Sequence, residues 1–154
     1  MLFWLHLVAT GLFVGSTAGV ALFAVPGASR ASDGALRRAR LARALRLYDP
    51  LAIALLGVMV MTGAWSVTGY KQRLGQAYFA TFGSHLAWKL SLAFLVVMAG
   101  TYVAMGIGHR VVRAEDGAEP VDEARLAGQM RRLRGAVWTT VLLTLGTIAA
   151  ALRR

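Results

Sequence analysis

Long apolar runs alternate with polar blocks along the whole chain. Each of four runs is close to the roughly 20 residues that a helix needs to cross the hydrocarbon core of a bilayer. The runs span residues about 2–25, 51–67, 84–107 and 135–152. A soluble domain would spread charged residues over its whole surface, whereas here they lie between the runs. We therefore predict an all-α integral membrane protein, a single four-helix bundle over residues 1–154.

The first apolar run ends at Pro26 and Gly27, a pair that stops helices. The residues before the run lack the positive charges that open a signal peptide. The run is also longer than the apolar core of such a peptide. We expect it to remain in the mature protein as the first membrane-spanning helix.

The next segment, from Ser29 to Leu47, carries six arginines and a single acidic residue, Asp33. This composition predicts a short amphipathic helix that lies on anionic headgroups. Asp49 and Pro50 follow in the order of an N-cap and a first helical residue, so we expect the second span to start there. Capping explains Asp49 without any chemistry, and a proton-carrying role is the alternative.

The polar blocks differ in positive charge. The first and third blocks hold six arginines each, whereas the second block and the C-terminal tail together hold only Lys71, Arg73, Arg153 and Arg154. Lys and Arg collect on the cytoplasmic loops of membrane proteins. We therefore expect the two arginine-rich loops in the cytoplasm, both termini on the non-cytoplasmic side, and the chain in a bacterial inner (cytoplasmic) membrane.

Net charge and cysteine content narrow the function. A net charge of +10 would suggest nucleic-acid binding in a soluble protein, but arginines on cytoplasmic loops explain it here. We expect the lipid bilayer, and no nucleic acid, as a partner. The chain has no cysteine, which excludes disulfides, thiolate metal sites and thioether-linked haem.

Two of the three histidines are positioned to share a site. His85 and His109 lie on one predicted helix, about 36 Å apart at 1.5 Å per residue, and therefore at opposite membrane faces. His6 and His85 lie near the outer ends of spans that run in the same direction, so these two can meet. His109 borders a basic loop, where an interfacial histidine needs no function.

The spacing of the histidines also suggests two tandem hairpins. His6 lies 24 residues before Arg30, and His85 lies 25 residues before Arg110. Parallel repeats related by an axis along the membrane normal would bring the two histidines to equivalent positions. We treat this repeat as a hypothesis.

Two imidazoles at one depth, among apolar and aromatic side chains, are the usual ligands of six-coordinate haem b in a four-helix bundle. This predicts His6 and His85 as axial metal ligands. Lys89 and Gly100 share a helix face with His85. Lys89 could pair with a haem propionate, and Gly100 would let a flat group or a neighbouring helix approach closely. Trp88 is one of the aromatic side chains in this outer half; an interfacial aromatic belt and a snorkelling lysine are the structural alternatives.

Three glycines follow one another at intervals of four in the first span: Gly11, Gly15 and Gly19. They lie on the side of the helix opposite His6. Small residues at this spacing let helices pack closely in a membrane. We expect a second copy or a partner subunit to contact this face.

Methionines are the remaining soft ligands for Cu(I). Met59 and Met61 point about 200° apart on a helix and cannot converge on one ion. Met98 and Met105 share a face without a nearby histidine or cysteine. We expect these methionines to fill the core.

Three short motifs resemble those of known membrane families. Residues 5–15, Leu-His-Leu-Val-Ala-Thr-Gly-Leu-Phe-Val-Gly, are followed by Met61-Thr62-Gly63 and Trp88-Lys89-Leu90. Together they resemble the Leu-His helix, the Thr-Gly helix and the Lys-Leu helix of the copper-resistance D (CopD) family and of the HemJ-type protoporphyrinogen oxidases. The similarity covers about residues 2–113. It implies His6 and His85 as haem ligands and Lys89 as a supporting cation.

These observations lead to one main functional hypothesis and three alternatives. We expect a membrane protein that binds haem b and transfers electrons, alone or as a subunit of an oxidoreductase complex. HemJ-type protoporphyrinogen oxidase activity is the first alternative, and CopD-like handling or transport of copper is the second. The third is a non-catalytic structural subunit of a membrane complex.

Overall fold

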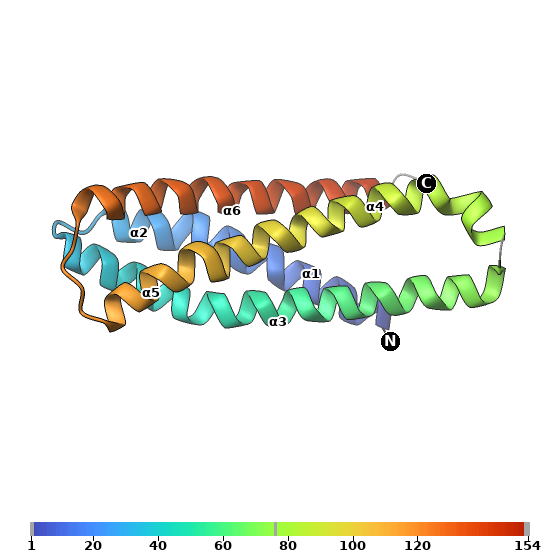
Figure 1. The fold of residues 1–154 in the computed structure, drawn as a ribbon, viewed down its shortest axis with the longest axis horizontal. Coiled ribbons are helices and arrows are strands. Elements are labelled where there is room, and N and C mark those ends of the chain that lie inside the picture. Colours follow the sequence, from blue (N-terminus) through green and yellow to red (C-terminus); the bar gives the residue numbers. More distant parts are fainter. Residues whose placement is uncertain (1, 76, 153–154) are drawn as a thin grey trace.

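The computed structural model describes residues 2–75 and 77–152, with side-chain surroundings for all of these except 70, 78–82 and 85. This part of the chain consists of helices and short connections, without a strand. The helices pack lengthwise into an elongated bundle (Figure 1). The prediction of an all-α four-helix bundle is therefore confirmed.

Four helical rods make up the bundle. The first rod consists of α1 (Leu2–Gly19), the π-helical segment η1 (Val20–Ala24) and α2 (Val25–Ser29), and the second is α3 (Gly34–Leu74). The third rod consists of α4 (Ala77–Thr101), the π-helical segment η2 (Tyr102–Gly108) and α5 (His109–Asp116), and the fourth is α6 (Glu123–Leu152). Each rod contains a helix that is long and apolar enough to cross a membrane, and each contains one predicted span.

The second rod differs from the sequence prediction at Asp49 and Pro50. Asp33, not Asp49, caps the helix: its backbone is extended (φ −114°, ψ 142°) and its carboxylate accepts a hydrogen bond from the N–H of Leu36 at 3.4 Å. The helix then continues through Pro50 to Leu74 without a break. The prediction that Asp49 and Pro50 start a new helix was wrong. Buried neighbours on both sides of the proline hold the helix together, and in an apolar surrounding a break would leave further backbone groups unpaired.

The arginine-rich start of α3 is part of the bundle and not a separate helix on the headgroups. Leu41 and Leu45 are fully buried in the core. Three of the five arginines in this segment pair with acids of the neighbouring helices α5 and α6. The pairs are Arg37 with Glu123 (3.1 Å), Arg38 with Glu115 (2.7 Å), and Arg46 with Asp116. The start of α3 therefore packs in the bundle, although its composition alone is typical of a surface helix.

A π-helical segment interrupts both the first and the third rod. In η1 the backbone N–H of Val25 donates to the carbonyl of Val20, five residues earlier. Such an insertion shifts the face that a helix presents. Val20 and Ala21, adjacent in sequence, are both buried, and so are Val103 and Ala104 in η2. The two rods that the tandem-repeat hypothesis pairs thus each carry one such segment.

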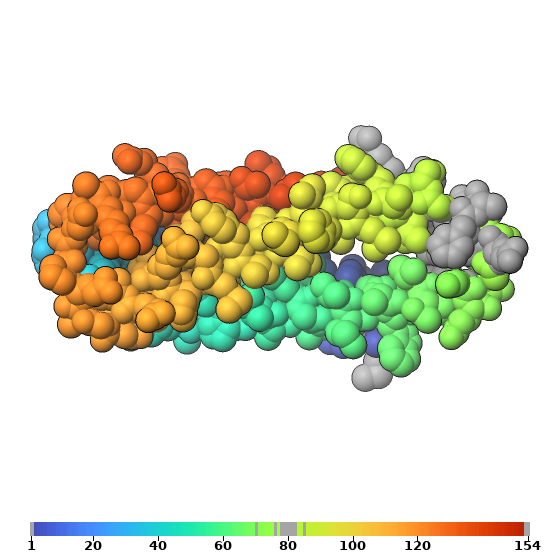
Figure 2. All heavy atoms as spheres, in the orientation of Figure 1, coloured from blue at the N-terminus to red at the C-terminus, as the bar shows by residue number. Residues whose placement is uncertain are grey.

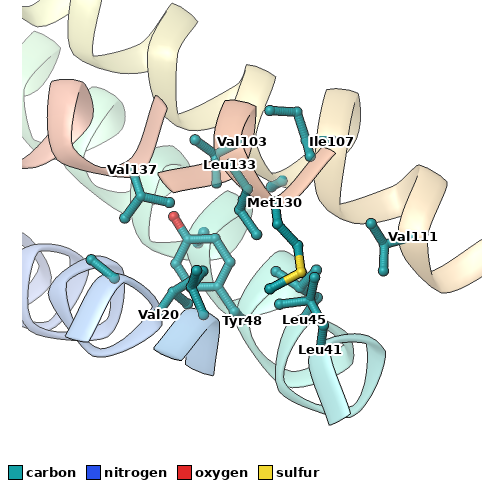
Figure 3. Close-up of a cluster of buried hydrophobic side chains, with 14 of the residues drawn as sticks. Val20, Leu41, Leu45, Tyr48, Val103, Ile107, Val111, Met130, Leu133 and Val137 are labelled. Atoms are coloured by element: carbon teal, nitrogen blue, oxygen red, sulfur yellow. The ribbon is translucent and has the colours of Figure 1, made fainter. Parts of the chain in front are cut away.

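The packed core lies toward the end of the bundle that holds the α2–α3 and α5–α6 connections. Apolar side chains of η1, α3, η2, α5 and α6 converge there (Figure 3). The labelled members are Val20, Leu41, Leu45, Tyr48, Val103, Ile107, Val111, Met130, Leu133 and Val137. The polar atom of Tyr48 is satisfied: its hydroxyl lies 3.2 Å from Thr17 Oγ1, which itself donates to the carbonyl of Phe13 at 2.6 Å. Because the threonine proton is used in this way, Tyr48 is the donor.

Candidate functional site

His6 meets α3 at the Thr-Gly pair. The half-buried imidazole places Nδ1 at 2.8 Å from Thr62 Oγ1. A Cβ added at Gly63 would lie 3.7 Å from Cε1 of the same ring, so the ring lies against this glycine as well. Two motifs separated by 56 residues in the sequence are therefore in direct contact.

The surroundings of Thr62 determine which nitrogen of His6 carries the proton. The Thr62 hydroxyl donates its single proton to the carbonyl of Val58 at 2.7 Å. Toward His6 it can then only accept, so Nδ1 of the imidazole is the donor. In the neutral ring this leaves the lone pair on Nε2. A metal-bound histidine commonly has this arrangement, in which the other ring N–H is held by an oxygen.

Thr62 has a role that the sequence reasoning did not assign. It is 4% exposed and lies between His6 and the backbone of its own helix. In the sequence, the motif Met61-Thr62-Gly63 stands out only by its resemblance to the Thr-Gly helix of the CopD and HemJ-type families. A polar residue within an apolar span, beside a glycine, is the sequence feature that marks this contact.

The second predicted ligand, His85, belongs to α4, but its side chain lies outside the described residues. Its pairing with His6 therefore stays a prediction. Lys89, one turn further along α4, is half-buried. Within the described part of the chain it forms no ion pair, so its charge has no carboxylate partner there.

Gly100 and Trp88 have different surroundings from those expected at a cofactor. A Cβ at Gly100 would lie 2.9 Å from Phe13 Cζ and 2.9 Å from Leu56 Cδ1. Of the two predicted uses of Gly100, close approach of neighbouring helices is therefore the one observed. Trp88 is 62% exposed on the outside of the bundle, where an aromatic belt would lie.

The half of the bundle that contains His6 is more open than the core half. Among the residues with described burial, no residue of α4 before Val96 is buried. On α3, no such residue after Thr62 is buried. The space-filling view shows a hollow between α3 and α4 in this half, with α1 visible behind it (Figure 2). The helices around the hollow are those that carry His6, Thr62 and Lys89.

A second concavity runs along α1 and α3. Its volume is about 510 Å³, within the range of small-molecule and cofactor sites. The lining is almost entirely apolar and includes the residue that holds His6. Its members are Leu2, Leu5, Ala54, Gly57, Val58, Met61, Thr62 and Trp65.

The remaining candidate ligands lie apart from His6. His109 is exposed and starts α5, in the arginine-rich half of the bundle, in keeping with its exclusion from the site. Among the described residues, no three His, Cys, Asp or Glu side chains converge as a metal site. Three of the four methionines considered for copper are exposed, at 67% for Met61, 55% for Met98 and 62% for Met105. The prediction that these three fill the core was wrong: their side chains face outward from helices that are long and apolar enough to cross a membrane.

Asp49, which the sequence predicts as a helix cap, places a carboxylate inside the bundle. Its Oδ1 is buried and has no hydrogen-bond partner among the described residues. Its carboxylate lies against Gly108, where an added Cβ would be 2.6 Å from Oδ2. Glycine at this position makes room for the carboxylate between α3 and η2.

The glycine face of α1 points away from the other helices. An added Cβ at Gly11, Gly15 or Gly19 would meet no atom of the described residues within 4 Å. The faces of the helix therefore divide as the angles predict, with His6 inward. The contact with a second copy or a partner at these glycines stays a prediction.

No protein-family model matches the chain, and no curated protein or solved structure matches it.

Proposed function

We propose that this chain is an integral membrane protein that binds haem b and transfers electrons, alone or within an oxidoreductase complex. The observation that carries the proposal is the 2.8 Å contact between His6 Nδ1 and Thr62 Oγ1. Because the Thr62 hydroxyl donates to the carbonyl of Val58, this contact leaves the metal-binding lone pair on Nε2. His6 would be one axial ligand, and His85 on α4 the other. Bound between two imidazoles, haem supplies a one-electron redox couple.

The residues around His6 fit this role. Thr62 and Gly63 hold the imidazole in one tautomer and one orientation, which keeps Nε2 available. Lys89 has no carboxylate partner in the described part of the chain, and its ammonium group suits a propionate. The apolar side chains of α1, α3 and α4 would surround a bound haem and so influence its reduction potential.

The same proposal includes a membrane orientation. The arginine-rich end of the bundle, which includes the connections α2–α3 and α5–α6, lies on the cytoplasmic side of a bacterial inner membrane by the positive-inside rule. His6 would then lie near the non-cytoplasmic face, together with both termini. Electron exchange at this site would take place with a partner on that side of the membrane.

The test is a visible spectrum of the full chain purified in detergent, oxidised and then reduced. We expect a Soret band and reduced α and β bands of a six-coordinate haem b. His6→Ala and His85→Ala should each abolish the six-coordinate spectrum, and the control His109→Ala should leave it unchanged. A Soret band that survives the double replacement of His6 and His85, or the absence of any Soret band, would reject the proposal.

A second candidate is a protoporphyrinogen oxidase of the HemJ type. The contact of His6 with Thr62 and Gly63 favours it, because two motifs that carry the resemblance meet there. The two candidates differ in one assay, the oxidation of protoporphyrinogen by the haem-loaded protein. Activity lost on replacement of His6 supports the enzyme, whereas haem without activity supports the electron carrier. Copper binding without haem, or co-purification with other subunits and no pigment, would instead support copper handling or a structural role.

A further inference from the structure

The arginine-rich end of the bundle contains a polar pocket that the proposed haem site does not use. Its volume is about 250 Å³, and it lies between α3, α5, the connection after α5 and the start of α6. Its lining is Arg38, Arg110, Arg113, Ala114, Glu119, Pro120, Val121, Asp122, Arg125, Leu126 and Gln129. Four of these residues are arginines, whose side chains end in guanidinium groups.

Three of the four arginines have no acidic partner. Arg110 and Arg113 lie three residues apart and therefore on one face of α5, and Arg125 lies in the first turn of α6. None of them forms an ion pair within the part of the chain that the structure describes. Arg38 differs: its side chain is 11% exposed, and it donates to Glu115 Oε2 and to the carbonyl of Glu119, both at 2.7 Å. It forms a fixed wall of the pocket.

The acids at this end are largely engaged elsewhere. Glu115, Asp116 and Glu123 pair with arginines of α3. Asp122 lines the pocket, but its Oδ1 accepts the backbone N–H groups of Ala124 and Arg125 at the start of α6. Only Glu119 among the lining residues is a carboxylate with no such partner in the described chain. Because Arg38 is already paired with Glu115, the other three arginines face two carboxylates, Glu119 and Asp122, which leaves the pocket with excess positive charge.

We propose that this pocket binds a phosphate-bearing anion, either the headgroup of an anionic phospholipid or soluble phosphate. The planar, five-donor guanidinium matches the oxygens of a phosphate, and three arginines that line the pocket provide such donors from two helices. The pocket begins where α5 leaves the apolar part of its rod, the level at which headgroups lie if the bundle spans the membrane. Leu126, Val121 and Pro120 supply an apolar wall beside the arginines. Basic pockets between helices on the cytoplasmic side are known to hold anionic headgroups.

The experiment uses the full chain in nanodiscs of phosphatidylcholine with a small fraction of labelled phosphatidylglycerol. Native mass spectrometry measures how much of the label each variant retains. Arg113→Gln with Arg125→Gln removes two pocket arginines, and Arg43→Gln with Arg132→Gln is the matched control, because those side chains are exposed outside the pocket. We expect the pocket variant to retain about tenfold less of the label, because it loses the charge-assisted contacts of two exposed arginines, and the control to change retention by less than about twofold.

Two further measurements complete the test. The first distinguishes phospholipid from soluble phosphate, and the second uses a variant that should bind more tightly, which a misfolded protein would not do. Titration with inorganic phosphate in neutral detergent, followed by isothermal calorimetry, tests soluble phosphate. Saturable binding that the pocket variant loses would assign the site to phosphate, and retention of phosphatidylglycerol alone would assign it to lipid. Glu119→Gln removes the unpaired carboxylate and should tighten the same ligand about threefold. Equal losses in the pocket and control variants, or no binding in either arm, would overturn the proposal.

Discussion

One hydroxyl group, on Thr62, decides the chemistry available to a neighbouring imidazole. Its proton goes to the carbonyl of Val58, so its oxygen can only accept from His6. The same imidazole in an apolar surrounding would be free to hold its proton on either nitrogen. A threonine is well suited to this position, because it satisfies its own helix and the ring at once.

Replacing Thr62 with valine keeps the shape of the side chain and removes the acceptor for His6 Nδ1. If haem binds at Nε2, we expect its affinity to fall about tenfold, at the lower end of the effect of such supporting contacts. Titration of the purified protein with haem, followed at the Soret band, measures this. The control is Thr68→Val, which removes an exposed hydroxyl from the same helix. Unchanged affinity in Thr62→Val would mean that the hydrogen bond has no part in haem binding.

Gly108 is the residue that makes room for the carboxylate of Asp49. In Gly108→Ala the added methyl group and the carboxylate cannot keep their places, so we expect a loss of about 1–3 kcal/mol in the free energy of unfolding. Thermal unfolding in detergent measures it. Gly57→Ala is the control, because a Cβ there meets nothing within 4 Å, and it should be neutral or slightly stabilising. Combining Asp49→Ala with Gly108→Ala should recover part of the loss; a double variant as unstable as the single one would contradict the proposed clash.

At the scale of elements, α3 connects the open half of the bundle to the packed half. It carries Thr62 in one half and the buried Leu41 and Leu45 in the other. It is continuous through Pro50, so one helix belongs to both halves. Its first turns are held by ion pairs with α5 and α6, which fixes its register against the third and fourth rods.

The ion pairs of α3 differ in burial, and their contributions should differ accordingly. Arg38 and Glu115 are 11% and 25% exposed in their side chains, whereas Arg46 and Asp116 are 50% and 58% exposed. We expect Arg38→Met to lower the free energy of unfolding by about 2 kcal/mol, because it leaves Glu115 and the Glu119 carbonyl without a donor in a half-buried place. Arg46→Met should cost less than about 1 kcal/mol. Thermal unfolding of both variants in detergent provides the comparison, and equal effects would contradict this ranking.

At the scale of the whole molecule, the bundle divides into a packed half and an open half. The packed half contains the core around Tyr48 and the ion pairs of α3. The open half contains His6, the hollow between α3 and α4, and the apolar groove along α1. If haem binds beside His6 as proposed, it occupies the open half, and the packed core in the other half can remain closed.

The proposed orientation predicts which connections a water-soluble reagent can reach. The chain has no cysteine, so single cysteines can be introduced without altering others. Ser32 in the α2–α3 connection and Gln72 near the end of α3 are both exposed. In intact cells we expect a membrane-impermeant maleimide to label Gln72→Cys, and to label Ser32→Cys only after the membrane is permeabilised. The reverse pattern would place the arginine-rich end outside and would put the proposed haem site on the cytoplasmic side.

Most of the fold could be predicted from the order of apolar and polar residues. Burial of four long apolar stretches in lipid requires helices, because only helices or closed barrels satisfy every backbone group there. The inward face of α1 also followed from the sequence, since successive residues turn by about 100°. The angles place His6 opposite Gly11 and Gly15, and the structure has the same division.

The candidate site could be predicted only in part. His6 and Lys89 were identifiable, because ionisable groups in an apolar run are rare and costly. Gly100 was identified as a site of close approach, but which side chains approach it depends on how three helices cross. Thr62 could not be assigned a role from its own segment, because the proton on its oxygen matters only beside His6.

The sequence by itself thus determined the number of long helices, their apolar lengths and the faces on which ionisable residues lie, since these follow from local periodicity and from the cost of burying charge. Only the tertiary structure decided that α3 continues through Pro50, that Asp49 faces Gly108 and that Thr62 directs the proton of His6. These features depend on contacts between residues far apart in the chain. Their free energies arise only when the helices pack, so no local pattern of residues can encode them alone.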